Sequence, residues 1–157
     1  MNRKKLTELL VFIISAELVG ALSALFTGSF SAAYDVMHKP PLSPPAFLFP
    51  VVWTILYAVM GISAYLVFTS RVPQYQKGGA LKIYGAQLIV NFFWSIIYFR
   101  LEMRSAALID ILVLDILVAL MIIRFYRIRP VSAAMNLPYM IWLLFATYLN
   151  LATVILN

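Results

Sequence analysis

Amide and acidic side chains inside long apolar stretches are the residues of this chain that could do chemistry. Gln87 and Asn91 are four residues apart, so they share one face of a helix. Two amides on one face can bond a neighbouring helix, or they can offer donors and acceptors to a bound molecule. Asp110 and Asp115 are five residues apart, about 140° around a helix. This spacing counts against a two-carboxylate catalyst.

Conventional catalytic and metal-binding groups are scarce. The chain has no cysteine, which excludes disulfides, thiolate metal ligands and cysteine nucleophiles. His38 is the only histidine, which excludes a metal site of clustered histidines and would place the base of a serine triad in a proline-rich loop. Glu17 and the two aspartates are costly inside a bilayer unless protonated, paired or hydrated, so a proton relay is an alternative. We expect no metal site.

The elements that carry these residues are apolar enough to cross a membrane. Of 157 residues 64% are hydrophobic and 11% charged, and the mean hydropathy is +0.94, far from a soluble domain. Apolar stretches predict membrane-spanning helices over about 6–26, 47–69, 83–101, 105–124 and 131–156. We therefore expect an all-α integral membrane protein, a five-helix bundle forming one domain over residues 1–157.

The basic residues predict the orientation of this bundle. The net charge is +6, which in a soluble protein would suggest nucleic acid as a partner. Nine of the twelve basic residues fall on one side of a five-span arrangement, however: Arg3, Lys4, Lys5, Arg71, Lys77, Lys82, Arg124, Arg127 and Arg129. This asymmetry predicts a cytoplasmic N-terminus and an outer C-terminus, with no role for nucleic acid.

The connection over residues 27–46 is unusually long and rich in proline. Prolines fix φ and remove backbone donors, so we expect a stiff, extended lid. Its candidate residues are Tyr34, Lys39, Pro40, Pro44 and Pro45.

The first predicted helix carries small residues at strict four-residue spacing: Ala16, Gly20, Ala24 and Gly28. Such a stripe allows close packing within the monomer or at a dimer face.

Several motifs together resemble one family of membrane proteins. They are Tyr34, Lys39-Pro40, Pro44-Pro45, Trp53, Leu56-Tyr57 and Gly61, then Gln87-Leu88, Asn91 and Trp94, then Ala107 to Asp110, and Pro138 to Asn150. This pattern is similar to the translocator protein family, whose members are also called TspO, tryptophan-rich sensory protein or peripheral-type benzodiazepine receptor. The resemblance is to bacterial-type members, which implies the cytoplasmic membrane of a bacterium.

The resemblance implies a five-helix bundle, often dimeric, with a pocket that opens toward the lid. Family ligands are porphyrins such as protoporphyrin IX and haem, benzodiazepine-like drugs and, in animal members, cholesterol. A porphyrin or haem would thus be a ligand, with no obligatory cofactor. The implied ligand-binding residues are Phe49, Trp53, Tyr57, Gln87, Asn91, Trp94, Asp110, Trp142, Ala146 and Leu149. Trp94 could equally be an interfacial anchor.

Two departures from the family pattern bear on the ligand. Leu42 stands where the lid usually has tryptophan, so we expect closure by shape and apolar burial. No lysine or arginine follows Tyr148, which makes cholesterol doubtful as a partner.

Two further activities remain as alternatives to a porphyrin-binding receptor. Trp53 and Trp142 could take part in light-driven oxidative breakdown of a bound porphyrin, an activity attributed to some bacterial relatives. A carrier for tetrapyrroles or lipids is the other alternative, and the lack of a sequence repeat and of broken helices argues against it.

Overall fold

The computed structural model describes residues 3–28, 34 and 39–156, and every regular element in this part of the chain is a helix. The elements are α1 (Arg3–Thr27), α3 (Leu48–Phe68), α4 (Gln74–Ser95), the π-helical turn η1 (Ile96–Arg100), α5 (Arg104–Ile128), α6 (Pro130–Met135) and α7 (Leu137–Leu156). They form five segments long and apolar enough to cross a membrane. The predicted all-α, five-span fold is confirmed.

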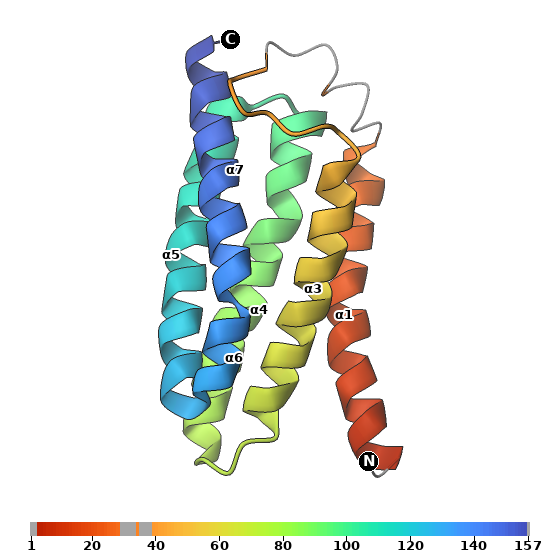
Figure 1. Cartoon of the computed structure of the whole chain (residues 1–157), viewed down its shortest axis with the longest axis vertical. Helices are drawn as coiled ribbons and strands as arrows, with labels where there is room; N and C mark the ends of the chain where they lie inside the picture. Colours follow the sequence, from red (N-terminus) through yellow and green to blue (C-terminus); the bar gives the residue numbers. More distant parts are fainter. Residues whose placement is uncertain (1–2, 29–33, 35–38, 157) are drawn as a thin grey trace.

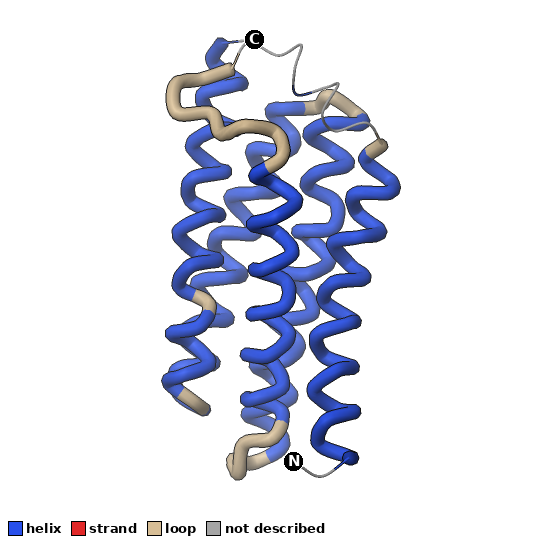
Figure 2. Tube along the Cα trace, turned by 45° about the vertical axis from the view of Figure 1, so that its right-hand side comes forward, coloured by secondary structure: helices blue, strands red, loops and turns tan. Residues whose placement is uncertain are grey.

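The five segments stand side by side and alternate in direction (Figure 1). The N-terminus and the α3–α4 and α5–α6 connections lie at one end, and residues 39–46 of the lid, the η1–α5 connection and the C-terminus lie at the other (Figure 1). The turned view in Figure 2 shows the same arrangement, with loops confined to the two ends apart from one short interruption within the last span. Since the basic residues of α1, of the α3–α4 connection and of the end of α5 share the N-terminal end, we call it the basic end.

Two predicted helix bounds were too short at the basic end. The third span begins at Gln74 and not at 83, and the fourth continues to Ile128 and not 124. Pro73 precedes α4 and provides the fixed φ that suits a helix start. Hydropathy finds only the apolar part of a helix, whereas the first turns of α4 and the last turn of α5 carry polar or basic side chains such as Lys77 and Arg127. They extend each helix beyond its apolar part.

The fifth span is broken at Asn136, contrary to the expectation of unbroken helices. Pro138 has no amide hydrogen for the preceding turn. Asn136 compensates through its side chain: Nδ2 donates to Ser63 Oγ and, at 2.8 Å, to the carbonyl of Ser132. Ser63 Oγ itself donates to that carbonyl at 2.9 Å. All three residues are fully buried. The hydrogen bonds at the break therefore link α3 to the α6–α7 segment.

Helix α1 packs on α3 and α4 through small residues and hydroxyl groups. Ala16 is fully buried, and a Cβ at Gly20 would overlap the ring of Tyr57. Ser23 donates to the carbonyl of Phe92 at 2.7 Å, and Thr27 donates to Ser95 at 3.0 Å. The first half of the small-residue stripe therefore serves packing within the monomer. Its second half, Ala24 and Gly28, is exposed.

Candidate functional site

A small cavity lies under the described part of the lid, between α3, α4 with η1, and α7. Its free volume is about 30 Å³, enough for no more than a few water molecules. Its lining consists of Tyr34, Lys39, Pro40, Ser43, Phe49, Trp94, Tyr98, Phe99, Ala146, Leu149, Asn150 and Thr153. Most of these side chains are apolar or aromatic, as is typical of a small-molecule site.

The lid is fastened over this cavity by Tyr34. Its hydroxyl donates to the carbonyl of Pro44 at 2.7 Å, and its ring meets that of Phe49 edge-on at 5.3 Å between centroids. The ammonium of Lys39 lies 4.6 Å from the centroid of the Tyr34 ring, within the range of a cation–π contact. At the α7 side, Tyr148 donates to the carbonyl of Pro41 at 3.1 Å. The lid thus contacts the bundle at two points, through the Tyr34 ring on α3 and the Tyr148 hydroxyl of α7, and the bond from Tyr34 to Pro44 braces it internally.

Leu42 takes no part in this closure. It is 81% exposed and has a φ of 67°, a left-handed conformation that is uncommon for a residue other than glycine. Closure by apolar burial is provided instead by the buried Tyr34 and Pro40. His38 and the rest of the lid, residues 29–33 and 35–37, lie outside the described residues.

The π-helical turn η1 brings an extra aromatic ring to the cavity. In an α-helix Trp94 and Tyr98 share a face, whereas Phe99 is displaced from it. The wider turn, in which the amide of Leu101 donates to the carbonyl of Ile96 at 3.0 Å, allows Phe99 to line the same cavity. Such turns are frequent at functional sites.

The polar groups of the α4 and α7 walls are hydrogen-bonded to each other. Trp94 Nε1 donates to Asn150 Oδ1 at 3.2 Å, and Asn150 Nδ2 donates to the carbonyl of Arg104 at 3.0 Å. Tyr98 donates to Thr153 Oγ1 at 3.1 Å. Trp94 is only 7% exposed, so it lies inside the bundle and not at a lipid interface. Of the two roles left open for Trp94, its position fits the pocket.

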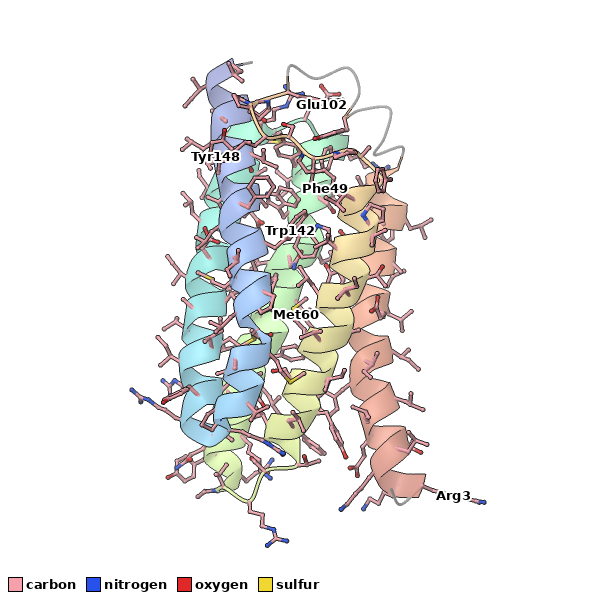
Figure 3. The ribbon with its side chains drawn as sticks, viewed as in Figure 1. Arg3, Phe49, Met60, Glu102, Trp142 and Tyr148 are labelled. Carbon is pink, nitrogen blue, oxygen red and sulfur yellow. The ribbon has the colours of Figure 1, made fainter. Side chains whose placement is uncertain are left out.

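Two further tryptophans lie beside the cavity, on its inner side. Trp142 meets the Phe49 ring at 6.0 Å between centroids, and both lie beneath the lid between α3 and α7 (Figure 3). The indole nitrogen of Trp142 is buried, with no hydrogen-bond partner among the described residues. The ring centroid of Trp53 lies 5.6 Å from that of Tyr57 and 6.1 Å from that of Tyr139. Trp53 therefore separates the cavity from a lower layer of buried side chains that contains these two tyrosines.

That lower layer is a buried network of two amides and two tyrosines. Tyr57 donates to Asn91 Oδ1 at 3.2 Å, and Asn91 Nδ2 donates to the hydroxyl of Tyr139 at 2.9 Å. Tyr139 in turn donates to Gln87 Oε1 at 2.9 Å. Gln87 Nε2 approaches the Met60 sulfur at 3.6 Å. The network joins α3, α4 and α7, and its amides are engaged by protein groups.

The predicted ligand-binding residues therefore fall into three places. Phe49, Trp94, Ala146 and Leu149 line the cavity together with Tyr34, Lys39 and Pro40 of the lid. Tyr57, Gln87 and Asn91 belong to the lower network, with Trp53 and Trp142 between the two layers. The prolines at positions 44 and 45 shape the lid beside the cavity.

The intramembrane acids do not line the cavity. Asp110 is on α5, and its Oδ2 is buried with no hydrogen-bond partner among the described residues. Asp115 accepts a hydrogen bond from Thr147 of α7 at 2.9 Å. The two thus stand apart, as their spacing predicts. In the described part of the chain no three histidine or acidic side chains come together to hold a metal ion.

Sequence reasoning missed several residues of both layers. Tyr98, Phe99, Asn150 and Thr153 line the cavity, and Tyr139 occupies the centre of the lower network. The four-residue spacing of Trp94 and Tyr98 was a usable signal for the first of these. Tyr139 could have been sought as a partner for the two amides, since buried polar groups require one.

By its fold and its site, the chain is a five-helix integral membrane protein with an aromatic cavity at one end of the bundle. Residues 12–156 match the model of the TspO/MBR family. The chain is 36% identical to the tryptophan-rich protein TspO of Archaeoglobus fulgidus, an alignment that covers 90% of this chain and 95% of the relative. It is 34% identical to a tryptophan-rich sensory protein of Cereibacter sphaeroides (79% and 76% covered). It is 33% identical to the human translocator protein (74% and 70% covered). The chain belongs to the TspO/MBR family.

Proposed function

We propose that this protein is a membrane receptor that binds porphyrins, such as protoporphyrin IX or haem, and related lipophilic ligands between the lid and helices α3, α4 and α7. The observation that carries the proposal is the convergence of aromatic rings from the lid, α3 and α4 with η1 on one cavity that α7 closes with small and apolar side chains, with Trp142 of α7 against the Phe49 ring. The sensory and translocator names of its relatives support a receptor role.

Flat aromatic ligands need ring faces and a few polar anchors. Phe49, Trp53 and Trp142 offer the faces: Phe49 contacts the Tyr34 ring of the lid and the Trp142 ring, and Trp53 contacts the Tyr139 ring of the lower network. Lys39, at the cavity rim, offers a cation for a ligand carboxylate. The indole N–H of Trp142 offers a donor that the described residues leave unused.

Binding requires the lid to move, because the free volume of about 30 Å³ is far too small for a porphyrin. The ring contact of Tyr34 with Phe49 of α3 and the hydrogen bond from Tyr148 of α7 to Pro41 are the contacts that open. Gln87 and Asn91 can then bond the ligand only by exchanging their bonds to Tyr139 and Tyr57. This makes them a second, deeper set of anchors.

The charge distribution sets the direction of access. The end that carries α1's Arg3, Lys4 and Lys5 faces the cytoplasm under the positive-inside rule. The cavity and the described residues of the lid lie near Phe49, at the opposite end of the bundle from Arg3 (Figure 3). The ligand therefore enters from the outer side of the membrane or from its outer leaflet.

Titration of the purified protein with protoporphyrin IX, followed by quenching of tryptophan fluorescence, tests the proposal. We expect saturable quenching, because Trp53, Trp94 and Trp142 all lie at or beside the cavity. Replacing Ala146 in the cavity wall by leucine places a larger side chain where the ligand must lie; an overpacking cost of about 1–3 kcal/mol borne by the complex alone weakens binding roughly 5- to 140-fold.

Ala21→Leu is the matched control, because it makes the same change at an exposed position on α1. Its affinity should equal that of the wild type. Absence of saturable quenching in the wild-type protein contradicts the proposed function. Equal affinity of the Ala146→Leu variant and the wild type contradicts the assignment of the pocket.

A further inference from the structure

Helices α1 and α3 separate at the basic end and leave a groove between them. The groove has a volume of about 460 Å³ and is lined by Lys4, Thr7, Glu8, Val11, Phe12 and Phe68. We call it the α1–α3 groove. It is about fifteen times as large as the cavity under the lid, 460 against 30 Å³, and it lies at the opposite end of the bundle.

Close packing one level higher explains why the helices part here. At Gly61 the backbones of α1 and α3 nearly touch, since a Cβ there would lie 2.7 Å from the Phe12 carbonyl oxygen and from the Cα of Ile13. Toward the basic end, the rings of Phe12 and Phe68 stand 5.3 Å apart between centroids and keep the helices from closing. The groove is therefore a fixed product of one glycine contact and one pair of rings.

The groove combines an apolar wall with a basic rim. Val11 is 59% exposed, and with the two phenylalanine rings it forms a surface suited to an alkyl chain. Lys4 is part of the lining, with Arg3 and Lys5 beside it in the chain. Lys77 Nζ donates to the carbonyls of Phe68 and Ser70, each at 3.2 Å, and so places a second cation at the end of α3 beside the groove.

The charge balance of this rim selects the occupant. Two cations, Lys4 in the lining and Lys77 at the Phe68 carbonyl, stand against one carboxylate at the groove, that of Glu8, and basic pockets between membrane helices suit anionic headgroups. We propose that the α1–α3 groove binds an anionic glycerophospholipid of the adjacent leaflet, with an acyl chain against Val11 and Phe12 and the headgroup phosphate at Lys4. A second copy of the chain fits less well, because a two-fold contact would bring two sets of these cations together.

Native mass spectrometry of delipidated protein in detergent, titrated with phosphatidylglycerol or phosphatidylcholine of equal chain length, tests this inference. We expect phosphatidylglycerol to bind more tightly. Lys4→Gln should reduce its affinity about fivefold, the contribution of one basic residue near anionic lipid. Arg127→Gln removes one charge at the same end of the bundle on α5 and should leave the affinity unchanged. Val11→Trp should obstruct the groove and reduce the binding of both lipids.

Three results would overturn the proposal. Equal affinity for the two lipids removes the role of the headgroup charge. Equal losses in Lys4→Gln and Arg127→Gln show general attraction to the basic end and not a site. If Val11→Trp leaves lipid binding intact but abolishes a dimer in the mass spectrum, a second copy occupies the groove. All three variants alter exposed side chains, so each should fold.

Discussion

Replacing Tyr139 by phenylalanine should destabilise the protein through the buried network between α3, α4 and α7. The Tyr139 side chain is completely buried, and its hydroxyl accepts a hydrogen bond from Asn91 and donates one to Gln87, each at 2.9 Å. The substitution keeps the ring and removes only these two bonds. Any loss of stability therefore measures the network itself.

The expected loss is about 1–3 kcal/mol. Interhelical hydrogen bonds in membrane proteins average about 0.6 kcal/mol and reach about 1.7, so two of them set this range. A soluble core would lose more, because each orphaned group there costs about 1–3 kcal/mol. For a chain of 157 residues, each kcal/mol shifts Tm by about 2–4 °C. We therefore expect Tm to fall by about 2–12 °C.

Thermal unfolding in detergent, followed by circular dichroism, measures this shift. Tyr126→Phe is the matched control, because Tyr126 is 63% exposed on α5. The double variant Tyr139→Phe with Gln87→Leu should lose less stability than the two single variants lose together. Removing both partners of a hydrogen bond leaves fewer orphaned polar groups than removing each partner alone. If Tyr139→Phe and Tyr126→Phe unfold at the same temperature, the network contributes nothing and the reasoning is refuted.

Three further outcomes concern helix packing, helix propensity and the lid. Gly61→Ala should lower stability by about 1–3 kcal/mol in the same unfolding assay, because its Cβ would meet the Phe12 carbonyl oxygen at 2.7 Å. Gly85→Ala meets nothing within 4 Å and should raise stability by up to about 1 kcal/mol through helix propensity. Tyr34→Phe removes the bond to the carbonyl of Pro44, worth about 1 kcal/mol. Hydrogen exchange of lid amides should accelerate about fivefold.

Each of these outcomes has a contradicting result. A Gly61→Ala variant as stable as the wild type would mean that α1 shifts freely on α3. A loss in Gly85→Ala would mean that a neighbour packs on that face. Unchanged lid exchange in Tyr34→Phe would mean that other contacts hold the lid closed.

The membrane fold was predictable because burial in a bilayer leaves a compositional record. Helices of about 20 apolar residues are visible in any hydropathy profile, which is why all five spans were found. The same record misses polar turns, and so α4 appeared to start nine residues late, at 83 and not at 74. The break at Asn136 was also missed. Pro138 permits a kink there, but the kink is stabilised by a side-chain hydrogen bond to Ser63, a residue distant in the chain, which sequence spacing does not reveal.

Which site residues share a face of one helix could be predicted from the sequence, but which residues of different helices contact each other mostly could not. Spacing alone placed Gln87 and Asn91 on one face, and they do share the lower network. Spacing says nothing about the register of one helix against another, so Tyr139 was not recognised as their shared partner. Nor does it show that Trp94 bonds Asn150, a contact that depends on how α4 and α7 are aligned.

The tryptophans are gathered at one end of the molecule, and this gives the protein an asymmetric optical signature. Trp53, Trp94 and Trp142 all lie at or near the cavity under the lid, while the α1–α3 groove contains no tryptophan among its lining residues. Ultraviolet emission thus originates in the half of the bundle nearer the lid. A quencher confined to the leaflet nearer the lid would reduce the tryptophan fluorescence far more than the same quencher confined to the other leaflet. Intrinsic fluorescence alone could therefore establish which way the chain is inserted in a vesicle.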